Sequence, residues 1–210
     1  MNAKLLVATR NPGKQREIRE LLVDVPYRIV FPEEQGIWES PDEAGLESEN
    51  SFEGNARRKA EYFAKQCRLP TVAEDSGLEV FALGGEPGVH SKRFALPTAD
   101  PREQDEANNR ELLRRLAGAP HDRRRARYCC VLIYLERPDA VPQRFEGQCL
   151  GRILEQPAGD GGFGYDPLFF SDDLGRSFAE VALEEKQRVS HRARAFGQFV
   201  AWLRDQRGNR

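Results

Sequence analysis

Residues 71–80 read TVAEDSGLEV, and the rest of the chain is organised around them. Two short apolar runs flank an acidic pair and a Ser-Gly turn. This pattern predicts a strand that ends by presenting Glu74, Asp75 and Ser76 at a sheet edge. Adjacent carboxylates repel each other unless a cation or a proton lies between them, and hard cations such as Mg²⁺ share carboxylate oxygens with substrate phosphates. The stretch is therefore either a solvated turn or part of a metal and phosphate site.

The size and charge of the chain set broad bounds. At 210 residues and 23.9 kDa it suits one large domain with a buried core. A net charge of −2 provides no global basic field, so binding to nucleic acid would need a local patch. The dense basic run is Arg123–Arg125 with Arg127, directly before an apolar stretch. We expect a solvated lead-in to a strand there, with nucleic-acid binding as an alternative.

The cysteines and the apolar segments indicate where the protein works. Cys67, Cys129, Cys130 and Cys149 include no C-x-x-C pair and no nearby His at zinc-site spacing. We expect buried, reduced thiols in a cytoplasmic protein. No segment has the long apolar run of a signal peptide or a membrane-spanning helix, so we expect no membrane association.

The first candidate for phosphate binding follows the first strand. Residues 5–8 predict a buried strand, and apolar residues at helical spacing between Ile18 and Val25 predict a helix. Asn11 is a good N-cap and Pro12 suits the first helical position. The free N–H groups at this helix start, with Lys14 in the first turn, would form an anion site. The alternative is a plain strand-to-helix connection, because the P-loop pattern is absent.

A second helix is expected from Asn50, which with Glu53 resembles a capping box. Asn55 and Lys59 lie one turn apart on this helix, so both can point the same way. The acidic loop before the helix carries Glu39, Asp42, Glu43 and Glu47. Most such loops are merely solvated, but one of these acids could fold over a metal at Asp75.

The second half of the chain contains a β-rich region and a glycine-rich segment. Residues 128–135 predict a central strand buried on both faces, and residues 143–153 indicate a further strand pair. Residues 159–167 place Phe163 and Tyr165 among four glycines. Such a backbone can approach a ligand closely, and aromatic rings can hold a planar base. The alternative is a turn that packs its aromatic rings into the core.

Near the C-terminus, Lys186 follows two glutamates, and Ser190 is a plausible N-cap for a final helix. His191 and Arg192 then fall in the first turn, where a cation is unfavourable for the helix dipole. A choice that breaks a local rule is a hint of function.

Seven motifs follow one another in order: T-x-N-P-G-K, F-E-x-N-A-x-x-K-A, A-E-D-S-G-L-E-V, L-G-G-x-P-G-V, G-G-F-G-Y-D-P-x-F, E-E-K and S-H-R. With them, residues 5–203 resemble the inosine/xanthosine triphosphate pyrophosphatase family. The resemblance implies an α/β fold with a mixed central sheet flanked by helices, and two lobes with the active-site cleft between them. It implies a single nucleotide pyrophosphatase domain over residues 1–210, with a β-rich lobe at approximately 125–170. It also implies a homodimer, Mg²⁺ as cofactor, and hydrolysis of ITP, dITP and XTP to the monophosphate and pyrophosphate.

The same resemblance implies roles for individual residues. Asp75, Lys14 and Lys59 would be catalytic, with Asp75 as the base acting on water. Asp75 and Glu43 would bind the metal. The substrate-binding residues would be Thr9, Arg10, Asn11, Pro12, Gly13, Lys14, Ser76, Phe163, Gly164, Tyr165, Asp166, Lys186, His191 and Arg192. Of these, His191 and Arg192 would face the 6-oxo group of the base.

The sequence departs from the family pattern at three places. Glu74 stands where the family commonly has the first Asp of Asp-Asp-Ser-Gly, and Gly54 stands where it commonly has Glu. An apparent insertion around residues 47–51 leaves Glu39, Asp42, Glu43 and Glu74 open as the second metal ligand. Two further functions therefore stay open, a non-catalytic nucleotide-binding regulator and a pyrophosphatase for other modified nucleotides.

Overall fold

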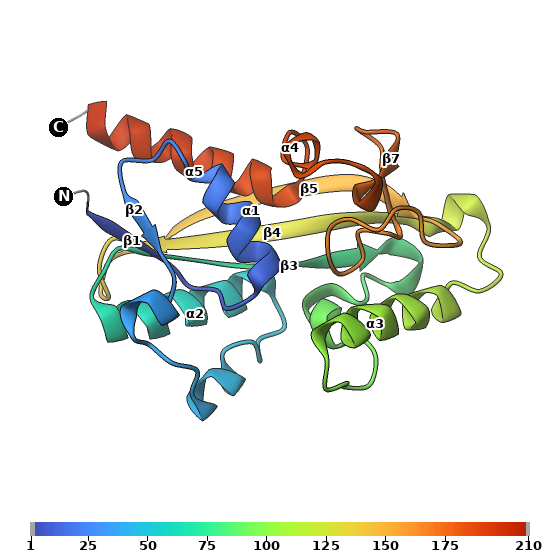
Figure 1. Ribbon diagram of the computed structural model, residues 1–210, viewed down its shortest axis with the longest axis horizontal. Helices are drawn as coiled ribbons and strands as arrows, with labels where there is room; N and C mark the ends of the chain where they lie inside the picture. The colour runs from blue at the N-terminus through green and yellow to red at the C-terminus, as the bar shows by residue number, and fades with distance from the viewer. Residues whose placement is uncertain (1–2, 209–210) are drawn as a thin grey trace. The chain divides into compact units, whose positions relative to one another are not determined.

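The computed structural model describes residues 3–208, which form a mixed sheet flanked by helices, as predicted (Figure 1). Within these residues the sheet has seven strands in the order β2-β1-β3-β4-β5-β6-β7. The strands are β1 (Lys4–Val7), β2 (Arg28–Val30), β3 (Thr71–Val80), β4 (Arg125–Leu135), β5 (Gln143–Ile153), β6 (Phe169–Ser171) and β7 (Arg176–Ser177). The helices are α1 (Pro12–Leu21), α2 (Phe52–Cys67), α3 (Pro101–Arg115), α4 (Leu183–Lys186) and α5 (His191–Gly208). Strand β1 runs parallel to β2 and β3, whereas β6 is antiparallel to β5 and β7.

The chain divides into two compact units, each made of separate stretches of sequence. Unit 1 comprises Met1–Asp75, Cys130–Gly147 and Arg192–Arg210, and unit 2 comprises Ser76–Cys129 and Gln148–His191. The chain passes from one unit to the other inside β3, β4 and β5 and at the start of α5. The stretch 125–170, expected as a β-rich lobe, is therefore shared by both units.

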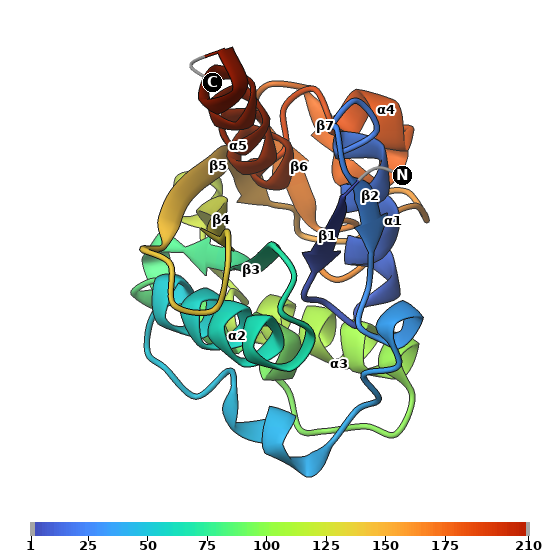
Figure 2. The ribbon, with the colours of Figure 1, turned by 90° about the vertical axis from the view of Figure 1, so that its left-hand side faces the viewer.

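In unit 1 the strands bury both of their faces. Leu5 and Val7 belong to an apolar cluster with residues of α1 and α5, while Leu6 and Ala8 belong to a cluster with residues of α2. Successive strand residues point to opposite faces, so α1 and α5 cover one face of this part of the sheet and α2 covers the other (Figure 1 and Figure 2). The run 128–135 is buried throughout, which confirms the strand predicted there.

The predicted end of the strand at Glu74 is wrong. β3 continues without a turn from Thr71 to Val80, and it lies between β1 and β4 rather than at an edge. A strand with a neighbour on each side can extend its hydrogen-bond ladder through a Ser-Gly pair that would favour a turn on its own. Because neighbouring strand residues alternate, the side chains of Glu74 and Asp75 point to opposite faces of the sheet.

The predicted strand pair at residues 143–153 is also wrong, because β5 is one strand of 11 residues. Its glycine at position 151 does not mark a turn. A Cβ atom there would lie 2.2 Å from the carbonyl oxygen of Phe170 on β6. The glycine therefore permits close approach of the neighbouring strand.

The helix starts were predicted with mixed success. α1 begins at Pro12, and Asn11 Oδ1 accepts a hydrogen bond from Lys14 N at 3.0 Å, as predicted. The capping box at Asn50 is wrong: Ser51 is the N-cap of α2, and its Oγ accepts from Gly54 N at 3.0 Å. α5 begins at His191, directly after Ser190, as expected.

The cysteines agree with the expectation of reduced thiols. The four cysteines are free thiols, three of them buried and Cys67 half-buried. Among residues 3–208, no helix is both long enough and apolar enough to span a membrane.

Candidate functional site

The connection from β1 to α1 places the segment predicted to hold phosphates, Thr9 to Lys14, at the start of a helix. Arg10 donates from Nε and Nη2 to the two oxygens of Glu43, at 2.7 and 2.6 Å, and from Nη1 to Glu33 at 2.7 Å. The hydrogen bond to Glu43 is the main reason why the pKa of Arg10 is raised. The bidentate contact thus ties Glu43 to the phosphate segment.

Asp75 is buried, with 6% of its surface exposed, and both of its carboxylate oxygens accept hydrogen bonds from α2. Asn55 Nδ2 donates to Oδ2 at 2.9 Å, and Lys59 Nζ donates to Oδ1 at 3.0 Å. The predicted alignment of Asn55 and Lys59 on one helix face is therefore confirmed. Two donors from neighbouring turns of one helix fix the orientation of the carboxylate.

Lys59 also connects Asp75 to the loop before α2. Its Nζ atom donates to Glu47 Oε1 at 2.8 Å. Burial alone would lower the pKa of Lys59, but the charges of Asp75, Glu47 and Glu74 outweigh it and raise the pKa. Lys59 therefore stays protonated at neutral pH.

Glu74 forms a second charged centre, on the other face of β3. Its Oε1 lies 2.9 Å from Lys14 Nζ and 3.3 Å from Arg192 Nη2, and Arg192 Nη1 donates to Glu17 at 2.5 Å. The Sγ atom of Cys130 donates to Glu74 Oε2 at 3.5 Å. Burial would raise the pKa of Glu74, but the charges of Lys14 and then Arg192 hold it well below the ordinary range.

This network changes the expectation for Arg192. The side chain is 2% exposed and belongs to unit 1, with Lys14 and Glu74, whereas the other residues expected at the base belong to unit 2. Glu17 was not identified from the sequence. It lies three residues after Lys14 on the same helix, and that spacing is a signal that could have identified it.

In unit 2, the glycine-rich segment is bound to Lys186. Asp166 Oδ2 accepts from Lys186 Nζ at 2.5 Å and from Phe163 N at 3.0 Å. Lys186 Nζ lies 5.2 Å from the centre of the Phe163 ring, within the range of a cation–π contact. Gly162 has φ of +73°, and a Cβ there would lie 2.1 Å from Asp166 Oδ2, so this turn requires glycine.

The two aromatic residues of this segment have different environments. Phe163 is partly exposed, whereas Tyr165 is 3% exposed and donates its hydroxyl hydrogen to the carbonyl oxygen of Ser91 at 2.8 Å. The alternative of a turn that packs its rings into the core therefore applies to Tyr165.

The remaining predicted residues of unit 2 are Ser76 and His191. The His191 ring is buried and stacks on Tyr128 with ring centres 4.6 Å apart. Ser76, half-buried, directly follows Asp75 in β3.

One of the departures from the family pattern has a local explanation. A Cβ on Gly54 would lie 2.8 Å from Glu49 Cβ, within the apparently inserted stretch. Glycine at position 54 thus allows this stretch to pack against the first turn of α2.

The carboxylate of Asp75 is a suitable ligand for a hard cation whose remaining ligands are phosphate oxygens. Among the described residues, no group of three or more His, Cys, Asp or Glu side chains gathers into a closed metal site. Mg²⁺ commonly binds through one or two carboxylates together with substrate phosphates and waters. Asp75 is one such carboxylate, and Glu47 shares the donor Lys59 with it.

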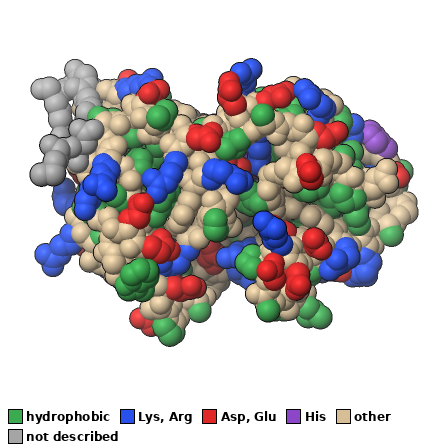
Figure 3. Space-filling model, viewed as in Figure 1, with side chains coloured by type: hydrophobic (Ala, Val, Ile, Leu, Met, Phe, Trp, Pro, Cys, Tyr) green, Lys and Arg blue, Asp and Glu red, His purple; other side chains and the backbone are tan. Residues whose placement is uncertain are grey.

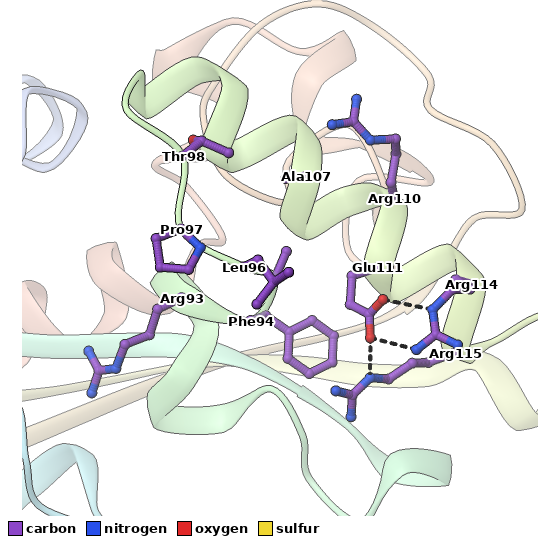
Figure 4. A pocket seen from close by; sticks show the side chains of 11 residues that line it. Arg93, Phe94, Leu96, Pro97, Thr98, Ala107, Arg110, Glu111, Arg114 and Arg115 are labelled. Atoms are coloured by element: carbon purple, nitrogen blue, oxygen red, sulfur yellow. Dashed lines mark hydrogen bonds and ion pairs between the residues drawn. The ribbon is translucent and has the colours of Figure 1, made fainter.

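Pockets elsewhere do not coincide with these groups. One of about 830 Å³ lies between α3 and residues 93–98 in unit 2, where Glu111 bridges Arg114 and Arg115 (Figure 4). Another of about 390 Å³ in unit 1 is lined in part by Tyr27, Tyr134 and Trp202. None of the predicted site residues lines either pocket.

Comparison with known proteins gives one consistent result. The model of the Ham1 family matches residues 5–202. A dITP/XTP pyrophosphatase of Syntrophobacter fumaroxidans is 45% identical, covering 96% of this chain and 85% of that protein, and one of Yersinia pseudotuberculosis is 44% identical, covering 96% and 98%. The solved structure of a HAM1 protein from Coxiella burnetii matches with a TM-score of 0.84 at 33% identity, covering 97% of this chain and 99% of that one. The resemblance inferred from the motifs is thereby confirmed, and the chain belongs to the Ham1 family.

Proposed function

We propose that this protein hydrolyses the deaminated purine nucleoside triphosphates ITP, dITP and XTP to the nucleoside monophosphate and pyrophosphate. Relatives called dITP/XTP pyrophosphatases, similar over nearly the full length of the chain, support the proposal. The structural observation that carries it is the buried Asp75, oriented by Asn55 and Lys59.

In the proposed reaction, Asp75 accepts a proton from a water molecule. The water oxygen attacks the α-phosphorus, the bond from this phosphorus to the bridging oxygen breaks, and pyrophosphate leaves with the bonding electrons. Help from a general base contributes about 10² to 10⁴ in rate. Fixed positive charges contribute the larger share by stabilising the transition state, and Lys14 and Lys59 are the proposed source of that charge.

We further propose Mg²⁺ as the cofactor, held by Asp75 and Glu43. When bound, the ion neutralises negative charge on the phosphates. Glu43 is favoured as the second ligand because Arg10 fixes it to the phosphate segment and only 12% of its side chain is exposed. Glu47 is the alternative, because it shares Lys59 with Asp75.

The proposed purine subsite uses the residues of unit 2 around Phe163. The partly exposed ring of Phe163 offers a surface for stacking, and Lys186 and His191 offer donors for a 6-oxo group. A donor that faces the 6-amino group of adenine would have no acceptor, and an unpaired buried donor costs free energy. The site would therefore bind ITP more strongly than ATP. The expected role of Arg192 at the base stays a prediction. Because Arg192 pairs with Glu17 and Glu74, a substitution of Arg192 would also remove a partner from both carboxylates.

The decisive experiment is pyrophosphate release from ITP, XTP, ATP, GTP and a modified pyrimidine triphosphate, with and without Mg²⁺. We expect release from ITP and XTP with Mg²⁺, and loss of at least roughly a hundredfold in kcat for Asp75→Asn with the fold intact. Tight binding of ITP without release would favour the non-catalytic regulator. Preference for the pyrimidine substrate would favour the other pyrophosphatase, and near-normal turnover of Asp75→Asn would remove Asp75 from the base role.

Three arginines of the basic run at the start of β4 have partners within the protein. Arg124 is buried and donates to three backbone carbonyl oxygens, while Arg125 pairs with Asp172 and Arg127 with Glu79. On the face drawn in Figure 3, basic and acidic side chains are interspersed. The homodimer and the cytoplasmic location stay predictions.

A further inference from the structure

The backbone of Gly164, next to Phe163, is held by side chains of α3. Asp105 Oδ2 accepts from Gly164 N at 2.7 Å, and Asn109 Nδ2 donates to Gly164 O at 3.0 Å. Asp105 and Asn109 are four residues apart, so they lie one turn apart on one face of α3. All three residues belong to unit 2. We call this arrangement the Gly164 clamp.

The clamp accounts for the hydrogen bonding of both α3 side chains. Within residues 3–208, the side chain of Asp105 makes no hydrogen bond other than the one to Gly164. The same is true of the side chain of Asn109, whose Oδ1 atom is buried without a partner. Gly164 itself has φ of +62°, a conformation that costs glycine little. The hydrogen bonds of the two side chains thus go to the backbone of Gly164 alone.

The segment that the clamp holds carries the proposed purine subsite. Phe163 directly precedes Gly164, and its own N–H is bound by Asp166, the partner of Lys186. Tyr165 directly follows and is anchored to Ser91. The Phe163 ring therefore extends from a backbone that is fixed on both sides, and such pre-organisation reduces the cost of binding a ligand.

Asp105 is an unusual choice for a purely structural anchor. Burial raises the pKa of its carboxyl group, against the opposing effects of the Gly164 N–H and the charge of Lys92. The folded state therefore favours the ionised form less than the unfolded chain does, although a neutral asparagine could accept the same hydrogen bond. Residues retained against stability are characteristic of functional sites.

We propose that Asp105 and Asn109 are positioning residues of the purine subsite, which hold Gly164 so that Phe163 is presented to the base. The inference rests on the proposed function, because it assigns the two residues to the base-binding part of that site. Neither residue touches the substrate. Both act through the backbone of residues 163–165.

The first test separates base binding from phosphate binding. KM and kcat for ITP are measured for Asp105→Ala and Asn109→Ala, together with the inhibition constant of inorganic tripolyphosphate, which has phosphates but no base. We expect KM to rise about threefold to tenfold per lost contact, with kcat and the inhibition constant little changed. An unchanged KM, or an equal weakening of tripolyphosphate, would overturn the proposal.

Conservative variants separate the loss of a hydrogen bond from a general loss of folding. Asp105→Asn keeps an acceptor for Gly164 N and should retain a near-normal KM. Asn109→Asp has the same shape but replaces the donor with an acceptor facing a carbonyl oxygen, so its KM should rise like that of the alanine variant. The same KM for both conservative variants would contradict the clamp.

Matched controls come from the same helix. Glu106 is next to Asp105, is 72% exposed at its side chain, and pairs with Arg110, which lines the pocket of Figure 4. Glu106→Ala and Arg110→Ala should leave KM for ITP unchanged. A similar rise in KM for these variants would show a general effect of α3 and would count against the clamp.

A final measurement keeps the clamp separate from the proposed function. Binding of IMP, which has a base and one phosphate, is followed by calorimetry, and hydrogen exchange is followed at the Gly164 amide. We expect weaker IMP binding and faster exchange in Asp105→Ala. If the wild type releases no pyrophosphate but these two effects appear, the proposed function fails and the clamp stands. If pyrophosphate is released but neither effect appears, the clamp fails alone.

Discussion

At the scale of single residues, the acidic pair at the centre of the sequence is not a pair in the structure. Glu74 and Asp75 point to opposite faces of β3, and each is neutralised by its own cations. Asp75 faces α2, which supplies Asn55 and Lys59, whereas Glu74 contacts Lys14 and Arg192. The repulsion expected between adjacent carboxylates is thus relieved by alternation along the strand.

Removing the charge of Glu74 should destabilise the protein strongly. Glu74→Gln leaves the buried Arg192 and the half-buried Lys14 beside a neutral group, and breaking a buried ion pair such as that with Arg192 costs about 3 to 5 kcal/mol. Unfolding in urea measures the loss. Glu74→Asp, which restores the residue common in the family, keeps the charge and should lose less. Equal stability of Glu74→Gln and the wild type would contradict the network.

The second metal ligand can be identified by comparing two neighbouring acids. We expect Glu43→Gln to raise the Mg²⁺ concentration needed for half-maximal activity, while Glu47→Gln changes it little. The reason is that two hydrogen bonds from Arg10 fix Glu43, whose side chain is 12% exposed, whereas that of Glu47 is 34% exposed. Calorimetric titration of Mg²⁺ with a non-hydrolysable nucleotide provides an independent measurement. The reverse order would assign Glu47 as the ligand.

At the scale of elements, the sequence predicts those features that depend on neighbours along the chain. The start of α1 follows from Asn11 and Pro12, and the shared direction of Asn55 and Lys59 follows from helical spacing. The Ser-Gly pair in β3 favours a turn locally, but a strand on each side of β3 outweighs this preference. Contacts between distant elements, such as Glu17 with Arg192 or Asp105 with Gly164, leave no periodic signal in the sequence.

The glycine at position 151 should be essential for the pairing of β5 and β6. In Gly151→Ala the new Cβ would meet the Phe170 carbonyl oxygen at 2.2 Å and the Phe169 ring at 2.7 Å, so the strands must separate. Such overpacking costs about 1 to 3 kcal/mol, which thermal unfolding can measure. Gly197→Ala is the control. Apart from its chain neighbours and the adjacent backbone of α5, no described atom lies within 4 Å of its added Cβ, and it should stabilise the protein by about 0.5 to 1 kcal/mol. Similar effects of both variants would contradict the prediction.

At the scale of the whole molecule, Asp105 should affect how stability depends on pH. Burial raises its folded-state pKa above the ordinary 3.8, against the Gly164 N–H and Lys92, while Tyr165 also lies within reach of its charge. The folded state therefore holds the proton more tightly than the unfolded chain, and stability falls as pH rises through the raised pKa. Asp105→Asn removes this effect. We expect it to be at least as stable as the wild type near pH 7, with the difference closing below about pH 4.

Unfolding curves over a range of pH values provide the measurement. The control is Glu106→Gln, which removes a charge from an exposed ion pair on the same helix and should leave the pH profile nearly unchanged. If Asp105→Asn is less stable than the wild type at neutral pH, and this difference does not grow at low pH, the raised pKa of Asp105 is contradicted.

The division of the chain at four points inside regular elements has an evolutionary consequence. The boundaries fall at Asp75–Ser76, Cys129–Cys130, Gly147–Gln148 and His191–Arg192. No single cut in the gene releases either unit as a continuous piece, so neither could be gained, lost or exchanged by a simple fusion. Groups proposed for the phosphates and groups proposed for the base are thus inherited together, and new substrate preferences in this lineage must arise by substitution rather than by recombination of modules.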